Sequence, residues 1–169
     1  MDINLINISP AVKIGPHYIA SLQSEGILHL DTPTLIIQDV IYKEDNRLFR
    51  IKCSLESPNK AFVGMIKDID EHVLEHAINV DGVFFSARDI GMTIEKDIYN
   101  EKIKKAFKPS YDNGTFEFTL HKKFHKTILL HLNKKVPFQS RIVLKNLTIE
   151  SSKFYTLWEL ADIKLISSF

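Results

Sequence analysis

The sequence has almost no cysteine and no long apolar run, and each shortage excludes a class of protein. Cys53 is the only cysteine in 169 residues, which excludes an internal disulfide and a cysteine-rich zinc site. No apolar stretch approaches the about 20 residues that cross a bilayer. The first residues also lack the basic start and cleavage site of a signal peptide. We therefore expect an intracellular protein with no membrane partner.

Most motifs of enzyme chemistry are missing as well. There is no glycine-rich phosphate loop and no Gly-x-Ser-x-Gly elbow, and Cys53 lies in an apolar strand pattern typical of a buried residue. His72, Glu75 and His76 do match the H-x-x-E-H signature of inverted zinc peptidases, with Glu150 as the candidate third ligand. Such spacing also arises on a solvated helix face. We predict no enzyme activity, no cofactor and no metal site, and keep a zinc peptidase as an alternative.

The hydrophobic pattern predicts one α+β domain over residues 1–169 that is mainly β. Alternation with a period of two predicts strands in the first third and again after residue 114, and a period near 3.6 predicts two helices between them. The clearest expected strands lie at 35–42, 48–55, 115–121 and 128–132, and the expected helices lie at 58–79 and 93–107. Ser57 is a suitable N-cap for the first helix. About five strands, two helices and four strands are therefore expected in chain order.

Residues 136–166 are expected to form two long strands joined by a polar turn at 150–153. Ile142 and Leu144 alternate with polar residues, and the phase slips near Asn146, which predicts a bulge. Trp158 lies between apolar residues on the second strand. We expect it to pack in the core in preference to stacking on a ligand.

Charge is unevenly distributed, although the net charge is only +1. Residues 102–145 hold eleven of the 22 Lys and Arg but two of the 21 Asp and Glu. This segment has a surplus of nine positive charges, and the remainder has a surplus of eight negative charges. The split indicates a basic face, the electrostatic footprint of a polyanion site. The alternative is a solvated surface with lysines that complement a helix C-terminus.

One basic stretch, residues 122–126, contains an aromatic ring. It reads Lys-Lys-Phe-His-Lys and lies between two expected strands, at the tip of a hairpin. A ring among three lysines would suit a sugar-phosphate backbone with a stacked base. The alternative for Phe124 is a loop aromatic that folds back on the core.

The order of several short segments resembles a family of single-stranded-DNA-binding proteins from nucleocytoplasmic large DNA viruses. These segments cover most of the chain from about Leu28 and are residues 28–33, 68–77, 83–86, 107–110, 137–145 and 154–160. The layout is also similar to OB-fold single-stranded-DNA-binding proteins of some phages. The resemblance implies an OB-fold-like Greek-key barrel with two inserted helices. It further implies a viral protein of DNA replication or repair that acts in the host cytoplasm, with the virion as a second location.

We therefore predict sequence-tolerant binding of single-stranded DNA, with lysines along the phosphates and rings stacked on bases. The predicted contacts are Lys122, Lys123, Phe124 and Lys126 at the tip, Arg141 and Lys145 on the adjoining strand, and Lys134, Lys135 and Tyr111 at the rim. Replication proteins and a second copy of the chain are the further partners expected. The rival hypothesis is a viral structural or scaffolding protein whose acidic face contacts the basic face of a neighbour.

Overall fold

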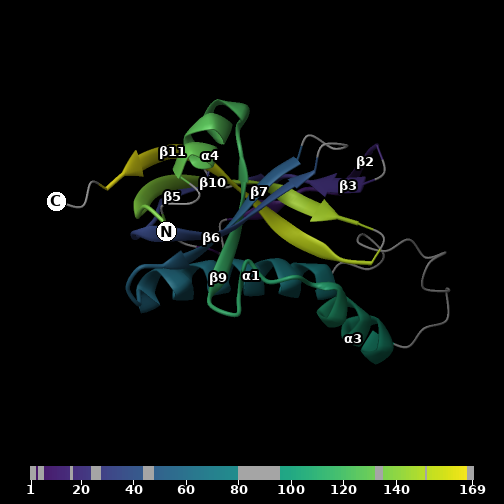
Figure 1. Cartoon of the computed structure of the whole chain (residues 1–169). Coiled ribbons are helices and arrows are strands. Elements are labelled where there is room, and N and C mark those ends of the chain that lie inside the picture. Colours follow the sequence, from purple (N-terminus) through teal and green to yellow (C-terminus); the bar gives the residue numbers. More distant parts are fainter. Residues whose placement is uncertain are drawn as a thin grey trace.

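The described part of the chain is built around one curved sheet with helices on either side of it (Figure 1). The computed structural model describes residues 3, 6–15, 17–23, 28–43, 48–79, 96–131, 135–150 and 152–166. Nine strands of the described part belong to one sheet, and two short strands pair separately. The expected class, α+β and mainly β, is confirmed.

Strands occupy both ends of the described chain, and the main helices lie between them. The strands are β1 (Asn7–Ile8), β2 (Val12–Ile14), β3 (His17–Ala20), β4 (Leu22–Gln23), β5 (His29–Asp31), β6 (Leu35–Lys43), β7 (Leu48–Leu55), β8 (Tyr111–Asp112), β9 (Thr115–Leu120), β10 (Phe138–Ile149) and β11 (Phe154–Leu165). The helices are α1 (Lys60–Asn79), α3 (Lys96–Ala106), the 3-10 helix η3 (Lys122–Phe124) and α4 (His125–His131).

Five of the strands close into a ring. Each hydrogen bonds to the next in the order β6, β7, β9, β11, β10, and β10 returns to β6 through the pair Phe138 and Leu35. Neighbours in the ring are antiparallel except β9 and β11, which run parallel where Glu159 pairs with Thr119. β5 and β3 continue along the same edge of β10 as β6, and β2 lies outside β3.

The core is built from the buried positions of these strands, which alternate as expected for a half-buried sheet. On β9, Phe116, Phe118 and Leu120 are buried, while the residues between them are partly exposed. Cys53 on β7 is fully buried, which confirms its expected place in an apolar strand. Trp158 is 2% exposed, so its expected core position is also confirmed.

The helix α1 lies along the sheet, on the opposite side from α4 in Figure 1. Its buried face carries Phe62, Ile66, Ile69, Val73 and Ala77 in i, i+3, i+4 spacing, as the pattern predicted. The cap is Asn59, whose side-chain oxygen accepts a hydrogen bond from the Phe62 N–H at 2.9 Å. The prediction of Ser57 as N-cap was therefore wrong by two residues, because Asn59 supplies the acceptor that the first turn needs.

The expected hairpin at residues 136–166 is confirmed as β10 and β11. The Glu150 N–H donates to the Lys153 carbonyl at 2.8 Å and closes the turn between them. The register shifts between Leu144 and Asn146, where a bulge was predicted, and again between Arg141 and Ile142.

The strand expected at residues 128–132 is wrong. Residues 125–131 form the helix α4 instead, and residues 122–124 form η3. Ile128 is 2% exposed whereas Leu130 is 62% exposed, so these two residues do not share a face as they would on a strand. The His125 ring stacks on Phe49 at 4.3 Å, which anchors the start of the helix to β7. No helix in the described ranges is long and apolar enough to cross a membrane.

Candidate functional site

The basic turn, residues 122–126, follows directly after β9. It is η3 and the start of α4, so the prediction of a hairpin tip was wrong even though the lysines lie on the surface. Lys122, Lys123 and Lys126 are all exposed. The backbone N–H of Lys123 donates to the His121 ring at 3.3 Å, which caps η3. Three exposed cations are thus held on a short ordered turn at the end of a core strand.

Phe124 in this turn already contacts the core and a neighbouring lysine. It is half-buried and packs against the hydrophobic core, as the alternative interpretation expected. The Lys123 ammonium lies 4.8 Å from the centre of its ring, within range of a cation–π interaction. A base could therefore use only part of this ring.

Two predicted contacts on β10, Arg141 and Lys145, already have acidic partners. The Arg141 Nε donates to Asp31 at 2.9 Å, and the Lys145 ammonium lies 3.6 Å from Glu159. The hydrogen bond and the charge of Asp31 raise the pKa of Arg141, and the hydrogen bond from Arg141 lowers the pKa of Asp31. Both pairs are exposed enough for solvent to screen them. These cations are less available to a polyanion than those of the basic turn.

Two of the three predicted rim residues, Tyr111 and Lys135, lie in the described part of the chain. Tyr111 lies on β8, beside the start of β9, and its ring packs on Phe116 at 4.6 Å. The basic turn is at the other end of β9, about 20 Å away for six residues of extended strand. Lys135 is exposed just before β10, with a φ of 46°. Lys134 and the segment 83–86 lie outside the described residues.

A second basic cluster, which the sequence did not predict, lies on the outward face of β7 and β9. Glu117 accepts a hydrogen bond from Arg50 Nη1 at 3.0 Å and another from the Lys108 ammonium at 2.9 Å. Burial acts to raise the pKa of Glu117, but the hydrogen bonds and charges of Lys108 and Arg50 outweigh it and hold the pKa below its usual range. One carboxylate thus holds two cations side by side, and the trio keeps one net positive charge.

Tyr155 extends this cluster to the turn between β10 and β11. Its hydroxyl accepts a hydrogen bond from Arg50 Nη2 at 2.7 Å and donates to Glu150 at 3.1 Å. Glu150 also pairs with Lys153 at 3.3 Å. The side chains of Arg50, Lys108 and Lys153 each lie within 6 Å of the centre of the Tyr155 ring. Since Tyr155 is only 7% exposed, its ring fixes these cations and is not itself open to stacking.

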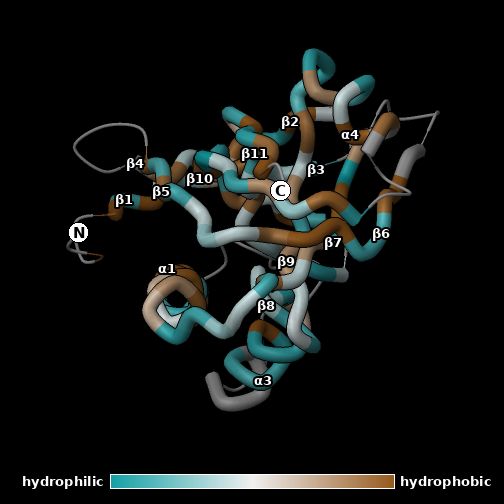
Figure 2. Tube along the Cα trace, turned by 60° about the vertical axis from the view of Figure 1, so that its left-hand side comes forward, coloured by the Kyte–Doolittle hydropathy of each residue, from teal (hydrophilic) through white to brown (hydrophobic). Residues whose placement is uncertain are grey.

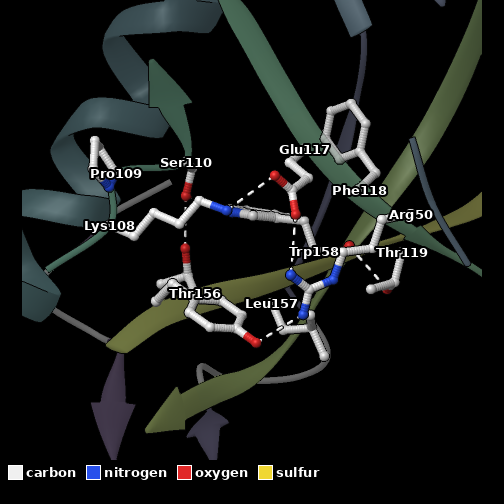
Figure 3. Close-up of a pocket in the computed structure, with 11 residues that line it drawn as sticks. Arg50, Lys108, Pro109, Ser110, Glu117, Phe118, Thr119, Thr156, Leu157 and Trp158 are labelled. Carbon is white, nitrogen blue, oxygen red and sulfur yellow. Dashed lines mark hydrogen bonds and ion pairs between the residues drawn. The ribbon is translucent and has the colours of Figure 1, made fainter. Parts of the chain in front are cut away.

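These side chains surround a small hollow (Figure 3). Its walls come from β7, β9 and β11 and from residues 108–110, and its cavity volume is about 30 Å³. Figure 3 shows Lys108 reaching across from one wall towards Glu117, with Arg50 on the other side of the carboxylate. A cavity of this size admits water-sized groups. The partly exposed lysines at its rim, and not the hollow, are therefore the part that can take a larger ligand.

Beneath this hollow lies a buried carboxyl group. Asp70 on α1 accepts hydrogen bonds from the Ser110 N–H at 2.6 Å, from the Ser110 hydroxyl at 2.7 Å and from Thr156 at 3.2 Å. The Trp158 indole N–H donates to the same Ser110 hydroxyl at 3.3 Å. Burial raises the pKa of Asp70 to about 6, against the opposing effect of the Ser110 and Thr156 hydrogen bonds. This network connects α1 and β11 to the segment that carries Lys108.

The second cluster and the basic turn both adjoin β9. Arg50 pairs in register with Thr119, and Lys52 pairs with Glu117. Thr119 is three residues before Lys122, a step of about 10 Å along an extended chain. The outward face of β7 and β9, together with Lys108 and the basic turn, thus forms one strip, which we call the β9 strip.

Sequence reasoning predicted the basic turn but missed the part of the β9 strip around Glu117. Arg50 and Glu117 each occupy an outward position in a strand pattern that was predicted, but they are 67 positions apart. Nothing in their local sequences indicates that they pair. Lys108 did belong to the predicted basic segment, but its contact with Glu117 was not predicted.

The residues of the H-x-x-E-H pattern have other contacts. A ring nitrogen of His72 lies 3.0 Å from the Ile6 carbonyl, and both histidines are partly buried. Burial lowers the pKa of His76, and the charge of His72 lowers it further. In the described portion, no three His, Cys, Asp or Glu side chains are grouped closely enough to hold a metal ion.

Comparison with known proteins finds no matching family model, no matching curated protein and no matching solved structure. The resemblance to the viral single-stranded-DNA-binding family therefore stays a prediction.

Proposed function

We propose that this chain is a single-stranded-DNA-binding protein built on an OB-fold barrel. The observation that carries the proposal is the connectivity of the five-stranded ring. In chain order its strands are β6, β7, β9, β10 and β11, and the fourth returns through a helix, α4, to lie beside the first. Spatial order 4-1-2-3 is that of a Greek key, and a small five-stranded Greek-key barrel is the layout of OB folds.

The position of the β9 strip supports the same function. OB folds bind oligonucleotides on the face of their second and third strands, which here are β7 and β9. That face carries Arg50 and Lys52, with Lys108 beside it and the basic turn at its end. The turn between the fourth and fifth strands contributes Lys153. A basic strip on this face suits a phosphate backbone.

We expect phosphate contacts to supply most of the affinity. Tyr155 is buried and Phe124 is half-buried, so stacking on these rings contributes less than in an open aromatic platform. Neutralised phosphates release counterions, which makes affinity fall steeply with salt and depend little on base sequence. The resemblance to the viral family supports a role in viral DNA replication or repair inside the infected cell.

The experiment is a comparison of single and double strands at one salt concentration. Fluorescence anisotropy would measure the affinity of the purified, metal-free protein for an oligothymidine of about 20 nucleotides and for a duplex of equal length. We expect tighter binding of the single strand, because the cations are spread over the strand face of β7 and β9 and its neighbouring turns and do not line one recognition helix. Equal or tighter binding of the duplex would refute the proposal.

A second candidate function, binding of another protein, is favoured by the exposed apolar residues on β2. Val12 is 62% exposed and Ile14 is 57% exposed, on a strand that pairs only with β3 among the described strands. Exposed apolar strands at a sheet edge can pair with another chain. Light scattering of the free protein, alone and with both residues changed to Ser, would separate the cases. Self-association abolished by the double change would support a structural role, and a monomer at every concentration would count against self-assembly.

A further inference from the structure

We infer that the helix α3 extends the proposed binding site, so that a bound single strand runs from the basic turn along β9 to Lys108 and onto α3. This inference rests on the proposed function. It adds a contact surface outside the five-stranded ring, supplied by the insertion between β7 and β9.

The outer surface of α3 is basic. Lys102, Lys104 and Lys105 are exposed, and the helix is mostly hydrophilic in Figure 2. The nearest acid on the helix, Glu101, lies 4.0 Å from Lys104 in a pair whose two side chains are more than half exposed. Such a pair is strongly screened by solvent. Three cations are thus available on the last two turns of the helix.

The helix is firmly anchored, so its lysines occupy defined positions. Ile103 is fully buried, and α3 packs against α1. The Phe107 N–H donates to the Ile103 carbonyl at 3.1 Å and continues the helical hydrogen bonds past Ala106. Phe107 also packs its ring on Phe154 at 5.1 Å. The last turn of α3 is therefore tied to β11.

Lys108 connects this helix to the β9 strip. It lies two residues beyond the end of α3, and its backbone N–H donates to the Phe154 carbonyl at 2.9 Å. Its ammonium reaches Glu117 on β9. The chain therefore leads directly from Lys104 and Lys105 on the helix to Lys108 and the strand face.

Two basic groups thus lie at different positions along β9. The basic turn begins two residues after the end of β9 at Leu120, and the Lys108 ammonium reaches Glu117 near the middle of the strand. From Glu117 to Lys122 is five residues, about 17 Å of extended chain, and the α3 lysines lie three to six residues before Lys108. A short oligonucleotide cannot contact both groups, whereas one that fills an OB-fold site of up to about 16 nucleotides can.

A structural role for the same lysines makes a different prediction. Cations in the last turn of a helix stabilise it through the helix dipole. If that were their only role, replacing them would change thermal stability and leave the salt dependence of DNA binding unaltered.

The test combines oligonucleotide length with charge variants. The α3 variant carries Lys102→Gln, Lys104→Gln and Lys105→Gln, because glutamine keeps the helix propensity while it removes the charges. The control variant loses three exposed lysines elsewhere, by Lys13→Gln, Lys60→Gln and Lys164→Gln. Both have the same net charge. Each is titrated with oligothymidines of about 5 and about 20 nucleotides over a range of salt concentrations.

We expect the slope of log affinity against log salt to be shallower by about 2 in the α3 variant with the long oligonucleotide. Each of the three lost phosphate contacts accounts for about 0.7 of this change. The short oligonucleotide and the control variant should keep the slope of the parent. Arginine at the three α3 positions should restore the long-oligonucleotide slope.

Two results would overturn the inference. One is an α3 variant that matches the control variant on the long oligonucleotide. The other is an equal loss of slope on the short one, which would put α3 beside the basic turn instead of at the far end. Failure of the proposed function looks different, because the parent protein would then bind neither oligonucleotide or would bind a duplex at least as tightly.

Discussion

Asp70 holds Ser110 by two hydrogen bonds at once, from its backbone N–H at 2.6 Å and from its hydroxyl at 2.7 Å. The carboxyl group belongs to α1 and is 5% exposed, while Ser110 lies in the segment between α3 and β8. This contact connects the longest helix to the wall of the β9 strip that carries Lys108. It also buries the Asp70 carboxyl group, which makes the stability of the fold depend on pH.

The contribution of Asp70 to the free energy of unfolding should fall as the pH rises from about 4 to about 6. Its pKa is raised by burial from 3.8 to about 6, so the folded state binds this proton more tightly than the unfolded state does. This stabilisation is complete below the pKa that Asp70 has in the unfolded state and is lost above the pKa that it has in the folded state. A difference of about two pKa units corresponds to about 3 kcal/mol. Urea unfolding at about pH 4 and about pH 7 measures it.

The control for this prediction is Asp70→Asn. The amide cannot ionise, so the difference in unfolding free energy between parent and variant should change by up to about 3 kcal/mol between the two pH values. Glu117 has a lowered pKa and acts in the opposite direction, but it is present in both proteins and cancels in the difference. A difference that is constant with pH would contradict the assignment.

Glu117→Gln should weaken folding and strengthen DNA binding. Glu117 is 19% exposed and is the shared partner of Arg50 and Lys108, so its loss leaves a partly buried guanidinium without a charged acceptor, at a cost of roughly 1–3 kcal/mol. The same change frees positive charge on the β9 strip and should steepen the salt slope by about 0.7. Chemical denaturation and anisotropy titrations measure the two effects.

The matched control is Asp31→Asn, which removes the acidic partner of Arg141 on β10 and leaves β7 and β9 unchanged. It should change neither affinity nor slope by a comparable amount. If Glu117→Gln lowered the affinity for single strands, the cluster around it would not face the ligand.

Replacing the three lysines of the basic turn together should remove about three phosphate contacts. With Lys122→Ala, Lys123→Ala and Lys126→Ala, the slope of log affinity against log salt should become shallower by about 2. Arg141→Ala with Lys145→Ala is the comparison, because both cations are already paired with acids and should change the slope less. An unchanged slope in the triple variant would remove the basic turn from the site.

Phe124→Ala should lower both stability and affinity, and Phe124→Leu separates the two effects. The ring packs against the core, so truncation to Ala leaves unfilled space and costs stability. Leu retains most of the packing but has no ring for stacking or for the Lys123 ammonium. We expect the Leu variant to be close to the parent in melting temperature and weaker for oligothymidine at every salt. Parent affinity in the Leu variant would show that bases do not stack on this residue.

The sequence by itself determined the elements whose burial pattern is long and regular. The face of α1 with Phe62, Ile66 and Ile69 was predicted correctly because five apolar residues repeat at helical spacing as far as Ala77. The hairpin of β10 and β11 and its bulge near Asn146 were predicted correctly for the equivalent reason in strands. These signals are local, so no distant residue has to be known to interpret them.

Short apolar runs were less informative. Residues 127–130 read Thr-Ile-Leu-Leu, which suits either a strand or a helix. Tertiary contacts decided in favour of α4, since the stack of His125 on Phe49 and the burial of Ile128 require spacing of three on one side. Because α4 replaces the predicted strand, Lys122–Phe124 form a 3-10 helix and not the predicted hairpin tip.

Only the tertiary structure decided which residues form the β9 strip. Closure of the ring pairs Leu35 with Phe138, and the pairing of β7 with β9 brings Arg50 to Glu117, 67 positions away. Asp70 and Ser110 meet across 40 positions because α1 packs beside the segment that leads into β8. Side chains on outward strand positions carry no sequence signal for their partners, since alternation specifies a face and not a neighbour. Their neighbours are set by the strand order and register of the closed ring.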